Sequence, residues 1–379
     1  MRILFVYKAR TNLGMGLPIR INRMRTFLQE SGHEVRESCL PSIKADLRGR
    51  HPGRVLRSFF PLRKQPIKLL SRDLPLYVDC NTGYNHLHRI CKRGKFDLIF
   101  SETSLVSLTA IAIGRKLSIP CIADIHGLAG AEARGNGEKN WAKKEELEAK
   151  VFRNSDHLLV VSNAMKAHIT ANFGVNSNKV SVVPNGSQLY PHIAKHASPL
   201  KAIYAGIFAY WEKVDDFLNI AREANSKDFE FSMLGAGAQE KQLKSRIRNE
   251  KIPIEFLGYQ RKEQAMKTMS QMQVGIAPST KDLARIVAFP IKILDYMACG
   301  LPVIAPKIGD WGEMIETEDC GVALKKDTSA DYLDALQNLK EKNTWIQKSQ
   351  NALKAIQIKY DWKKVLSPIE DILREIIRN

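Results

Sequence analysis

The sequence predicts an α/β protein built from two consecutive domains, each with a parallel sheet between layers of helices. Three observations support this. The chain has 379 residues, more than one hydrophobic core usually serves. Short apolar runs such as LLVV at 158–161 alternate with amphipathic segments, as strands buried on both faces alternate with helices. The alternation stops in the polar stretch 187–200 and restarts at 201, which indicates a domain boundary.

The first half contains six candidate strands with helices between them. The strands are expected at Ile3–Tyr7, Glu34–Cys39, Phe96–Ser101, Cys121–Ile125, His157–Val161 and Lys179–Val183. A helix is expected over Pro18–Ser31, because Ile21, Met24 and Leu28 recur on one face and Gly32 follows.

The second half repeats the pattern. Strands are expected at 201–206, 229–234, 254–259, 273–277 and 302–305, with a helix over Lys213–Asn225 after the first of them. We therefore predict a first domain at 1–190 and a second at 200–358, with a helix at 361–379 packing back on the first. A ligand cleft is expected between the domains, at the carboxyl ends of both sheets.

Positive charge is concentrated in the first half of the chain. The net charge is +18, and residues 1–200 contain 31 Lys and Arg against 15 Asp and Glu. The segment 47–72 holds eight basic residues, no acid and several interleaved apolar side chains. It is either a solvated insertion loop or a contact with an anionic membrane surface or acceptor. Nucleic acid is not expected as a partner, because no recognition motif accompanies the charge.

Cysteine usage and hydropathy indicate a cytoplasmic protein, with peripheral contact to the inner face of the membrane if segment 47–72 binds lipid. The six cysteines show no metal-ligand spacing and are expected to be free thiols. The apolar run at Ile3–Tyr7 is too short for a secretory leader and fits a first strand. No stretch of 18 uninterrupted apolar residues occurs.

The segment FPIKILDYMACGLPVIAP at 289–306 has the most specific pattern. Pro290 fits the first position of a helix, so the amides of Ile291 and Lys292 would point out of the helix start and bind a diphosphate. Asp295 lies three residues beyond Lys292, on the same helical face, where it would reach ribose hydroxyls. Gly300 closes the helix, and the next strand follows.

This segment resembles the donor-site signature S-P-x-K-x-x-E-Y-M-A-x-G-x-P-V of the family 4 retaining glycosyltransferases. Other stretches resemble the same family in order and spacing; they lie at 160–169, 182–190, 203–218, 256–279, 309–315 and 361–362. The resemblance spans nearly the whole chain and is strongest from 155 to 322. It implies the GT-B fold, in which two Rossmann-like βαβ domains face each other across a cleft.

The resemblance also implies roles for individual residues. It assigns donor binding to Gly206, Gly235, Gly237, Pro290, Ile291, Lys292 and Asp295. It assigns the catalytic roles to His126, Lys292 and Lys213. It places Gly14, Gly16 and Asn185 on the acceptor side. His126, in DIHG directly after a predicted strand, matches the family histidine that faces the transferred sugar.

Three positions depart from the family pattern. The usual Glu-x7-Glu pair is replaced by Val287 and Asp295, so its first carboxylate is absent. The usual Arg after the loop glycine is Ile207. The usual Lys column holds Glu212, with Lys213 one place later. These changes weaken the expected grip on the leaving diphosphate, and Lys213, Lys292 or Arg285 are candidates to compensate.

By resemblance, the reaction moves a hexose from a UDP- or GDP-sugar to a glycan, a lipid-linked acceptor or an envelope polysaccharide, with retention of configuration. No metal and no further cofactor are expected. Two alternatives remain: a non-catalytic relative that binds a nucleotide or sugar, and a nucleotide-sugar epimerase of similar shape. A nicotinamide-dependent dehydrogenase is disfavoured, because no G-x-G-x-x-G follows the first strand.

Overall fold

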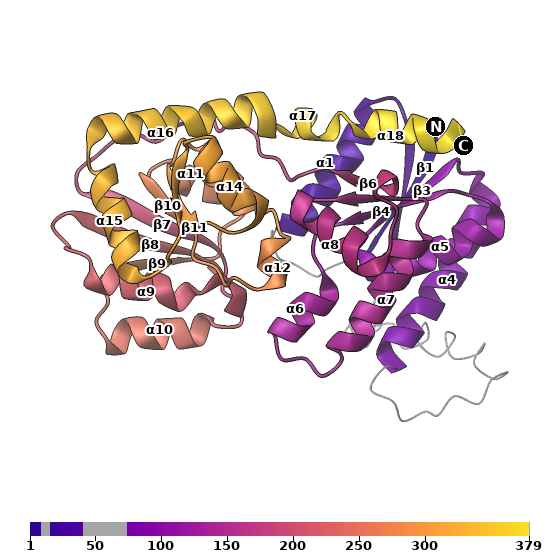
Figure 1. Cartoon of the computed structure of the whole chain (residues 1–379), viewed down its shortest axis with the longest axis horizontal. Helices are drawn as coiled ribbons and strands as arrows, with labels where there is room; N and C mark the ends of the chain where they lie inside the picture. Colours follow the sequence, from indigo (N-terminus) through magenta and orange to yellow (C-terminus); the bar gives the residue numbers. More distant parts are fainter. Residues whose placement is uncertain (9–15, 41–73, 379) are drawn as a thin grey trace.

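The computed structural model describes residues 1–8, 16–40 and 74–378 and confirms two α/β units, each built on a six-stranded sheet (Figure 1). Every strand pairing in the two sheets is parallel. Parallel neighbours need a crossover between them, so the chain alternates strand and helix, as the apolar periodicity predicts.

The first sheet has the order β2-β1-β3-β4-β5-β6. Its strands are β1 (Arg2–Lys8), β2 (Glu34–Leu40), β3 (Leu98–Glu102), β4 (Cys121–Ile125), β5 (His157–Val160) and β6 (Val180–Val182). The helices around it are α1 (Gly16–Glu30), α4 (Leu74–Gly94), α5 (Ser104–Leu117), α6 (Ala129–Gly135), α7 (Trp141–Asn154) and α8 (Asn163–Phe173). All six predicted strand segments in this half coincide with strands.

The second sheet has the order β12-β11-β10-β7-β8-β9. Its strands are β7 (Leu200–Ile207), β8 (Phe229–Ala236), β9 (Ile254–Gly258), β10 (Val274–Ile276), β11 (Val303–Pro306) and β12 (Gly321–Leu324). Its helices are α9 (Val214–Glu223), α10 (Glu240–Asn249), α11 (Lys262–Met269), α12 (Leu283–Ile286), α13 (Ile291–Ala298), α14 (Gly309–Thr317), α15 (Ser329–Leu339) and α16 (Lys342–Ala355). The sequence did not predict β12, which lies at the edge of this sheet beside β11.

Both faces of the first sheet are covered, and its central strands β3, β4 and β5 are therefore buried along their whole length, whereas the edge strand β2 is largely exposed. On β1, Leu4 and Val6 belong to one core cluster, whereas Ile3 and Phe5 point to the opposite face and belong to another. Successive side chains of a strand alternate between faces, so each face needs its own helical layer.

The end of the chain supplies part of that second layer. After α16, a π-helical turn leads into α17 (Trp362–Leu366) and α18 (Ile369–Arg378), which run across to the first sheet (Figure 1). Trp362, Ile369 and Leu373 pack in one cluster with Phe5 and Met24. The two helices at the carboxyl end of the chain therefore cover one face of the sheet that the first half of the chain forms.

Some predicted features lie outside the described residues, namely segment 47–72 and Gly14. Gly16 is the first residue of α1. No helix in the described part of the chain is long and apolar enough to cross a membrane. Cys91, Cys121, Cys299 and Cys320 are buried thiols that form no disulfide.

Candidate active site

A cavity of about 310 Å³ opens at the carboxyl ends of β7, β8 and β9. Gly206, Ile207 and Gly235 line its floor, and the first turn of α13 forms one wall. Ile19 of α1 lines it from the first domain. The cavity thus lies where the two units meet, at the edge where parallel α/β sheets bind ligands.

Helix α13 presents its amino-terminal end to this cavity. Pro290 is the N-cap, with φ −70° and ψ 126°, and Ile291 is the first helical residue. The prediction of Pro290 at the first helical position was therefore one residue off, because its extended ψ keeps it outside the helix. The amides at the first helical positions have no partner within a helix. Pro290, Ile291 and Lys292 all line the cavity, which leaves these amides positioned for an anion.

Lys292 is paired with an acid inside the same cavity. Its ammonium bonds Glu212 and lies 4.7 Å from the centre of the Tyr204 ring. The Lys292 and Glu212 side chains are only 13% and 6% exposed. Burial lowers the pKa of Lys292. Burial alone would raise the pKa of Glu212, but the charges of Lys292 and Arg285 lower it.

Lys213 lies elsewhere. It follows the short 3-10 turn Tyr210–Glu212, has a left-handed φ of 42°, and is the N-cap residue of α9. Its ammonium lies 2.7 Å from Asp216 and 3.4 Å from Asp327, and it is not among the described residues that line the cavity. The structure therefore turns Glu212 into the cavity and its neighbour Lys213 away from it.

Asp295 lies at the other end of the cavity. Its carboxylate accepts a hydrogen bond of 2.9 Å from Ser187 Oγ and pairs with Lys262. Tyr259 and Gln260 line the cavity beside it. The first turn of α13 and Asp295 thus line the same cavity, as the i, i+3 spacing of Lys292 and Asp295 predicts.

The predicted glycines allow close approaches of the backbone. A side chain at Gly206 would begin 3.5 Å from Lys292 Cδ, within the cavity. Gly235 has a φ of +146°, a backbone conformation that residues with a side chain rarely adopt. A Cβ at Gly237 would lie 2.4 Å from the Phe208 carbonyl oxygen, so this glycine lets two loops pack together.

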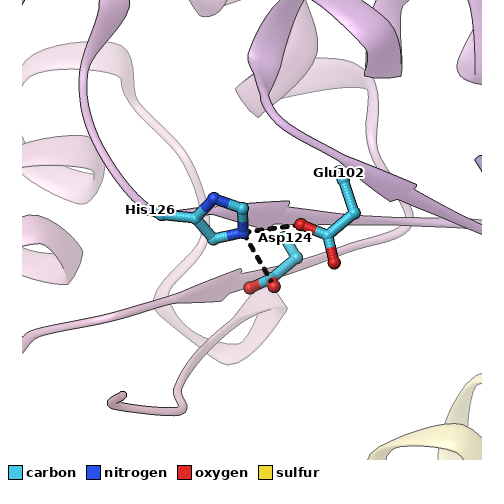
Figure 2. A group of neighbouring side chains, drawn as sticks. All are labelled: Glu102, Asp124 and His126. Carbon is cyan, nitrogen blue, oxygen red and sulfur yellow. Dashed lines mark hydrogen bonds and ion pairs between the residues drawn. The ribbon is translucent and has the colours of Figure 1, made fainter. Parts of the chain in front are cut away.

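A buried cluster of charges lies at the carboxyl end of the first sheet (Figure 2). Glu102 ends β3, Asp124 is in β4, and His126 follows β4. His126 Nε2 lies 2.7 Å from Glu102 Oε2 and 2.9 Å from Asp124 Oδ2. Arg20 of α1 forms two hydrogen bonds with Asp124, of 2.8 and 2.7 Å. Two carboxylates are thereby surrounded by two cations.

The charges in this cluster set each other's protonation. Burial alone would lower the pKa of His126, but Asp124 and Glu102 raise it to about 9. Burial would raise the pKa of Asp124, but Arg20 and His126 hold it well below its usual range. Burial and the charge of Asp124 raise the pKa of Glu102. His126 is therefore an imidazolium at neutral pH, and its Nε2–H donates to Asp124 and lies in ion-pair distance of Glu102, while the other ring nitrogen points away from both carboxylates (Figure 2).

Glu102, Asp124 and His126 are also of the ligand types that hold metal ions, with their ligand atoms within 4.8 Å of one another. Arg20 occupies both oxygens of Asp124, and His126 uses Nε2 for the carboxylates. The residues around this cluster thus fit a closed charge network better than a cation site.

Hydrogen bonds connect this cluster to the helix start in the second domain. Arg20 Nη1 donates to Asn185 Oδ1 at 3.2 Å, and Asn185 Nδ2 donates to the Phe289 carbonyl at 2.6 Å, directly before Pro290. His126 itself is not among the described residues lining the cavity. Sequence reasoning missed Arg20, Asp124 and Glu102. The signal for Asp124 was available, because it precedes His126 by two residues on the same strand end.

Two further contacts hold the domains together. Asp310 at the start of α14 accepts hydrogen bonds from the amides of Asn163 and Ala164 at 2.6 and 2.9 Å, which caps α8 from the other domain. Ser162 Oγ donates to the Val287 carbonyl at 2.6 Å. Val287 is itself buried. The position where the family pattern has an acid thus carries an apolar side chain and an interdomain backbone bond.

Comparison with known proteins places this arrangement in a family. Residues 16–189 match the family described as Glycosyltransferase Family 4, and residues 199–342 match Glycosyl transferases group 1. Together the matches leave out only 1–15, 190–198 and 343–379.

Individual relatives are distant. The chain is 22% identical over 281 residues to a glycogen synthase of Mycobacterium tuberculosis, covering 71% of this chain and 66% of that protein, slightly under two thirds. It is 21% identical over 345 residues to the UDP-Gal:alpha-D-GlcNAc-diphosphoundecaprenol alpha-1,3-galactosyltransferase of Escherichia coli, covering 86% and 85%. The structure of HepE from Anabaena in complex with UDP-glucose matches with a TM-score of 0.71 and 14% identity, over 99% of this chain and 100% of that one.

Proposed function

Because this chain belongs to the family 4, group 1 glycosyltransferases and has their GT-B fold, we propose that it transfers a hexose from a nucleotide-sugar donor to an acceptor hydroxyl with retention of configuration. The observation that carries the proposal is the start of α13. The amino-terminal residues of α13, with Lys292 and Asp295, line one cavity there, so that helix amides suited to an anion and a carboxylate suited to hydroxyls face the same space.

The donor we propose is a UDP- or GDP-sugar. The diphosphate would lie on the amides of Ile291 and Lys292, and Asp295 would accept from the ribose hydroxyls. The Asp295 carboxylate pairs with Lys262 and accepts a hydrogen bond from Ser187, so a ribose hydroxyl would replace one of these two contacts. HepE, which shares the fold, was solved with UDP-glucose bound.

In the proposed retaining reaction, the acceptor hydroxyl attacks from the face that the nucleoside diphosphate leaves. Negative charge then develops on the leaving β-phosphate, and the helix amides with Lys292 and Arg285 would stabilise it. The second ring nitrogen of His126 points away from the carboxylates, and we propose that its N–H would donate to oxygens of the transferred sugar. No metal is needed for either role.

For the acceptor we propose a glycan or a lipid-linked saccharide. The Escherichia coli relative, by its name, acts on a diphosphoundecaprenol-linked sugar. The basic and apolar segment 47–72 supports contact with an anionic membrane on which such an acceptor would lie.

Co-sedimentation with liposomes tests the membrane contact. We expect binding to vesicles with anionic lipid and little to neutral ones, and neutralising Arg54, Arg57, Arg63 and Lys64 should abolish it. Equal binding to both kinds of vesicle would contradict this proposal.

Release of nucleoside diphosphate from panels of UDP- and GDP-sugars, with and without membrane extract, tests the activity. The main rival is a non-catalytic relative that binds nucleotide, which the Glu212–Lys292 pair inside the cavity favours. Tight nucleotide binding with no turnover of any donor would support that rival. Product formed without any acceptor would indicate an epimerase instead.

A further inference from the structure

The wall of the donor cavity contains an acid at the point where the ligand's phosphates would lie. Glu212 ends the 3-10 turn Tyr210–Glu212 between β7 and α9, and it lines the cavity together with Lys292 and Arg285. It is nearly fully buried. Its carboxylate bonds the Lys292 ammonium and lies 3.8 Å from Arg285 Nη2.

Arg285 has spare hydrogen-bonding capacity on the same side. Its Nε donates to Ser279 Oγ at 3.0 Å, which fixes the guanidinium plane. Its Nη2 is buried, has no hydrogen-bond partner among the described residues, and has only the longer contact with Glu212. A buried guanidinium donor without a partner is costly, and an anion entering the cavity would satisfy it.

The charges at this end of the cavity are therefore partly cancelled before any ligand binds. Lys292, Arg285 and Glu212 together carry a net charge of +1, whereas a nucleoside diphosphate carries about two to three negative charges near pH 7. A carboxylate within a few ångström of the phosphate repels it strongly in a site with little water.

We propose that Glu212 acts as an internal counter-anion that competes with the ligand's diphosphate for Lys292 and Arg285, and so sets how strongly this site discriminates ligands by phosphate charge. The inference rests on the proposed function, because it presupposes that the cavity receives a nucleotide. In the resting state Glu212 takes the place of the diphosphate on Lys292. A ligand binds by separating that pair, and the pair re-forms when the diphosphate leaves.

Competition of this kind predicts a shallow dependence of affinity on phosphate number. Each phosphate added to a nucleoside gains contacts with the two cations but loses part of that gain to Glu212. Removing the Glu212 charge should therefore tighten diphosphates most, monophosphates less, and the uncharged nucleoside hardly at all.

The test is calorimetric titration with uridine, UMP and UDP, with the guanosine series in parallel, on the wild type, Glu212→Gln and Glu250→Gln. The control Glu250→Gln removes the same charge from the same domain. Glu250 lies at the carboxyl end of α10, where it pairs with Arg222 and Arg246. We expect Glu212→Gln to bind the diphosphate roughly 10-fold or more tightly than the wild type, and the nucleoside equally. Glu250→Gln should bind all three ligands as the wild type does.

Unchanged or weaker diphosphate binding by Glu212→Gln would overturn the inference and would mean that Glu212 merely positions Lys292. The wild type gives an independent measurement if the variant folds poorly: its UDP and UMP affinities should differ by less than roughly threefold, and a roughly 100-fold difference would overturn the inference. If neither the wild type nor Glu212→Gln binds any nucleotide, both the proposed function and this inference are wrong. If nucleotides bind but the effect of Glu212→Gln on affinity does not grow with the number of phosphates, this inference alone is overturned.

Discussion

The interior pair between Arg20 and Asp124 gives the strongest prediction for stability. Arg20 is 1% exposed and donates hydrogen bonds to both oxygens of Asp124, to the carbonyls of Val183 and Pro184, and to Asn185 Oδ1. It thus joins α1, β4 and the start of the connection to the second domain. Replacing it by methionine keeps an unbranched side chain of similar length and removes the charge and every donor.

The expected cost follows from what the substitution leaves behind. Asp124 is 0% exposed, and Arg20→Met removes the guanidinium that donates hydrogen bonds to both of its oxygens, so that His126 is the remaining cation beside it among the described residues. Breaking a buried ion pair by removing one partner costs about 3–5 kcal/mol, because the remaining charge stays desolvated. We therefore expect the first domain of Arg20→Met to lose about that much free energy of unfolding.

Urea unfolding followed by circular dichroism measures this loss, with Arg23→Met as the matched control. Arg23 lies less than one turn further along α1, is exposed, and donates one hydrogen bond of 3.2 Å, to Gln188, within the described residues. Its substitution should change the free energy of unfolding by less than about 0.5 kcal/mol. Adding Asp124→Asn to Arg20→Met should recover stability, because the carboxylate that lost its partner is then replaced by a neutral amide. A loss below about 1 kcal/mol in Arg20→Met, or no recovery in the double variant, would refute this reasoning.

Two further predictions concern activity and pH. Lys292→Ala should reduce turnover by roughly 100-fold or more, measured under conditions where circular dichroism shows the variant folded, because the substitution also breaks the buried pair with Glu212. Lys213→Ala, whose side chain pairs with Asp216 and Asp327, should keep most of its activity, and equal losses in the two variants in a donor-hydrolysis assay would remove the special role of Lys292. His126 has a pKa raised to about 9, so its stabilisation is full below about pH 6.5 and is lost as the pH rises through about 9. Urea midpoints measured from pH 6.5 to 9.5 should fall in the wild type but stay flatter in His126→Gln. His157→Gln is the control. Burial, with the charges of Lys166 and Lys179, lowers the pKa of His157 to about 4, so this histidine changes the pH dependence of stability only below about pH 6.5. A fall of the same size in His126→Gln would contradict the assignment.

The fold was largely predictable because strands buried on both faces must be apolar throughout. All eleven predicted strand segments coincide with strands of the two sheets. The miss, β12, is a run of four residues, and its identity as a strand depends on pairing with β11. The helix start at Pro290 was also predictable to within one residue, because proline restricts its own φ and has no amide to satisfy.

The candidate site was predictable only where its parts are local. Lys292 and Asp295 lie on one helix, so their spacing alone places them on the same side of the cavity. Lys213 shows the limit of this reasoning. One residue separates it from Glu212, but the backbone turns there with a left-handed φ, and only Glu212 enters the cavity.

By itself, the sequence determined the succession of strands and helices and the helix start that faces the cavity, because these depend on periodicities and backbone preferences within a few residues. Only the tertiary structure decided which charges meet. Arg20 reaches Asp124 across 104 residues and Lys292 reaches Glu212 across 80. An ion pair depends on distance and burial in space, and neither is encoded in the separation of two residues along the chain.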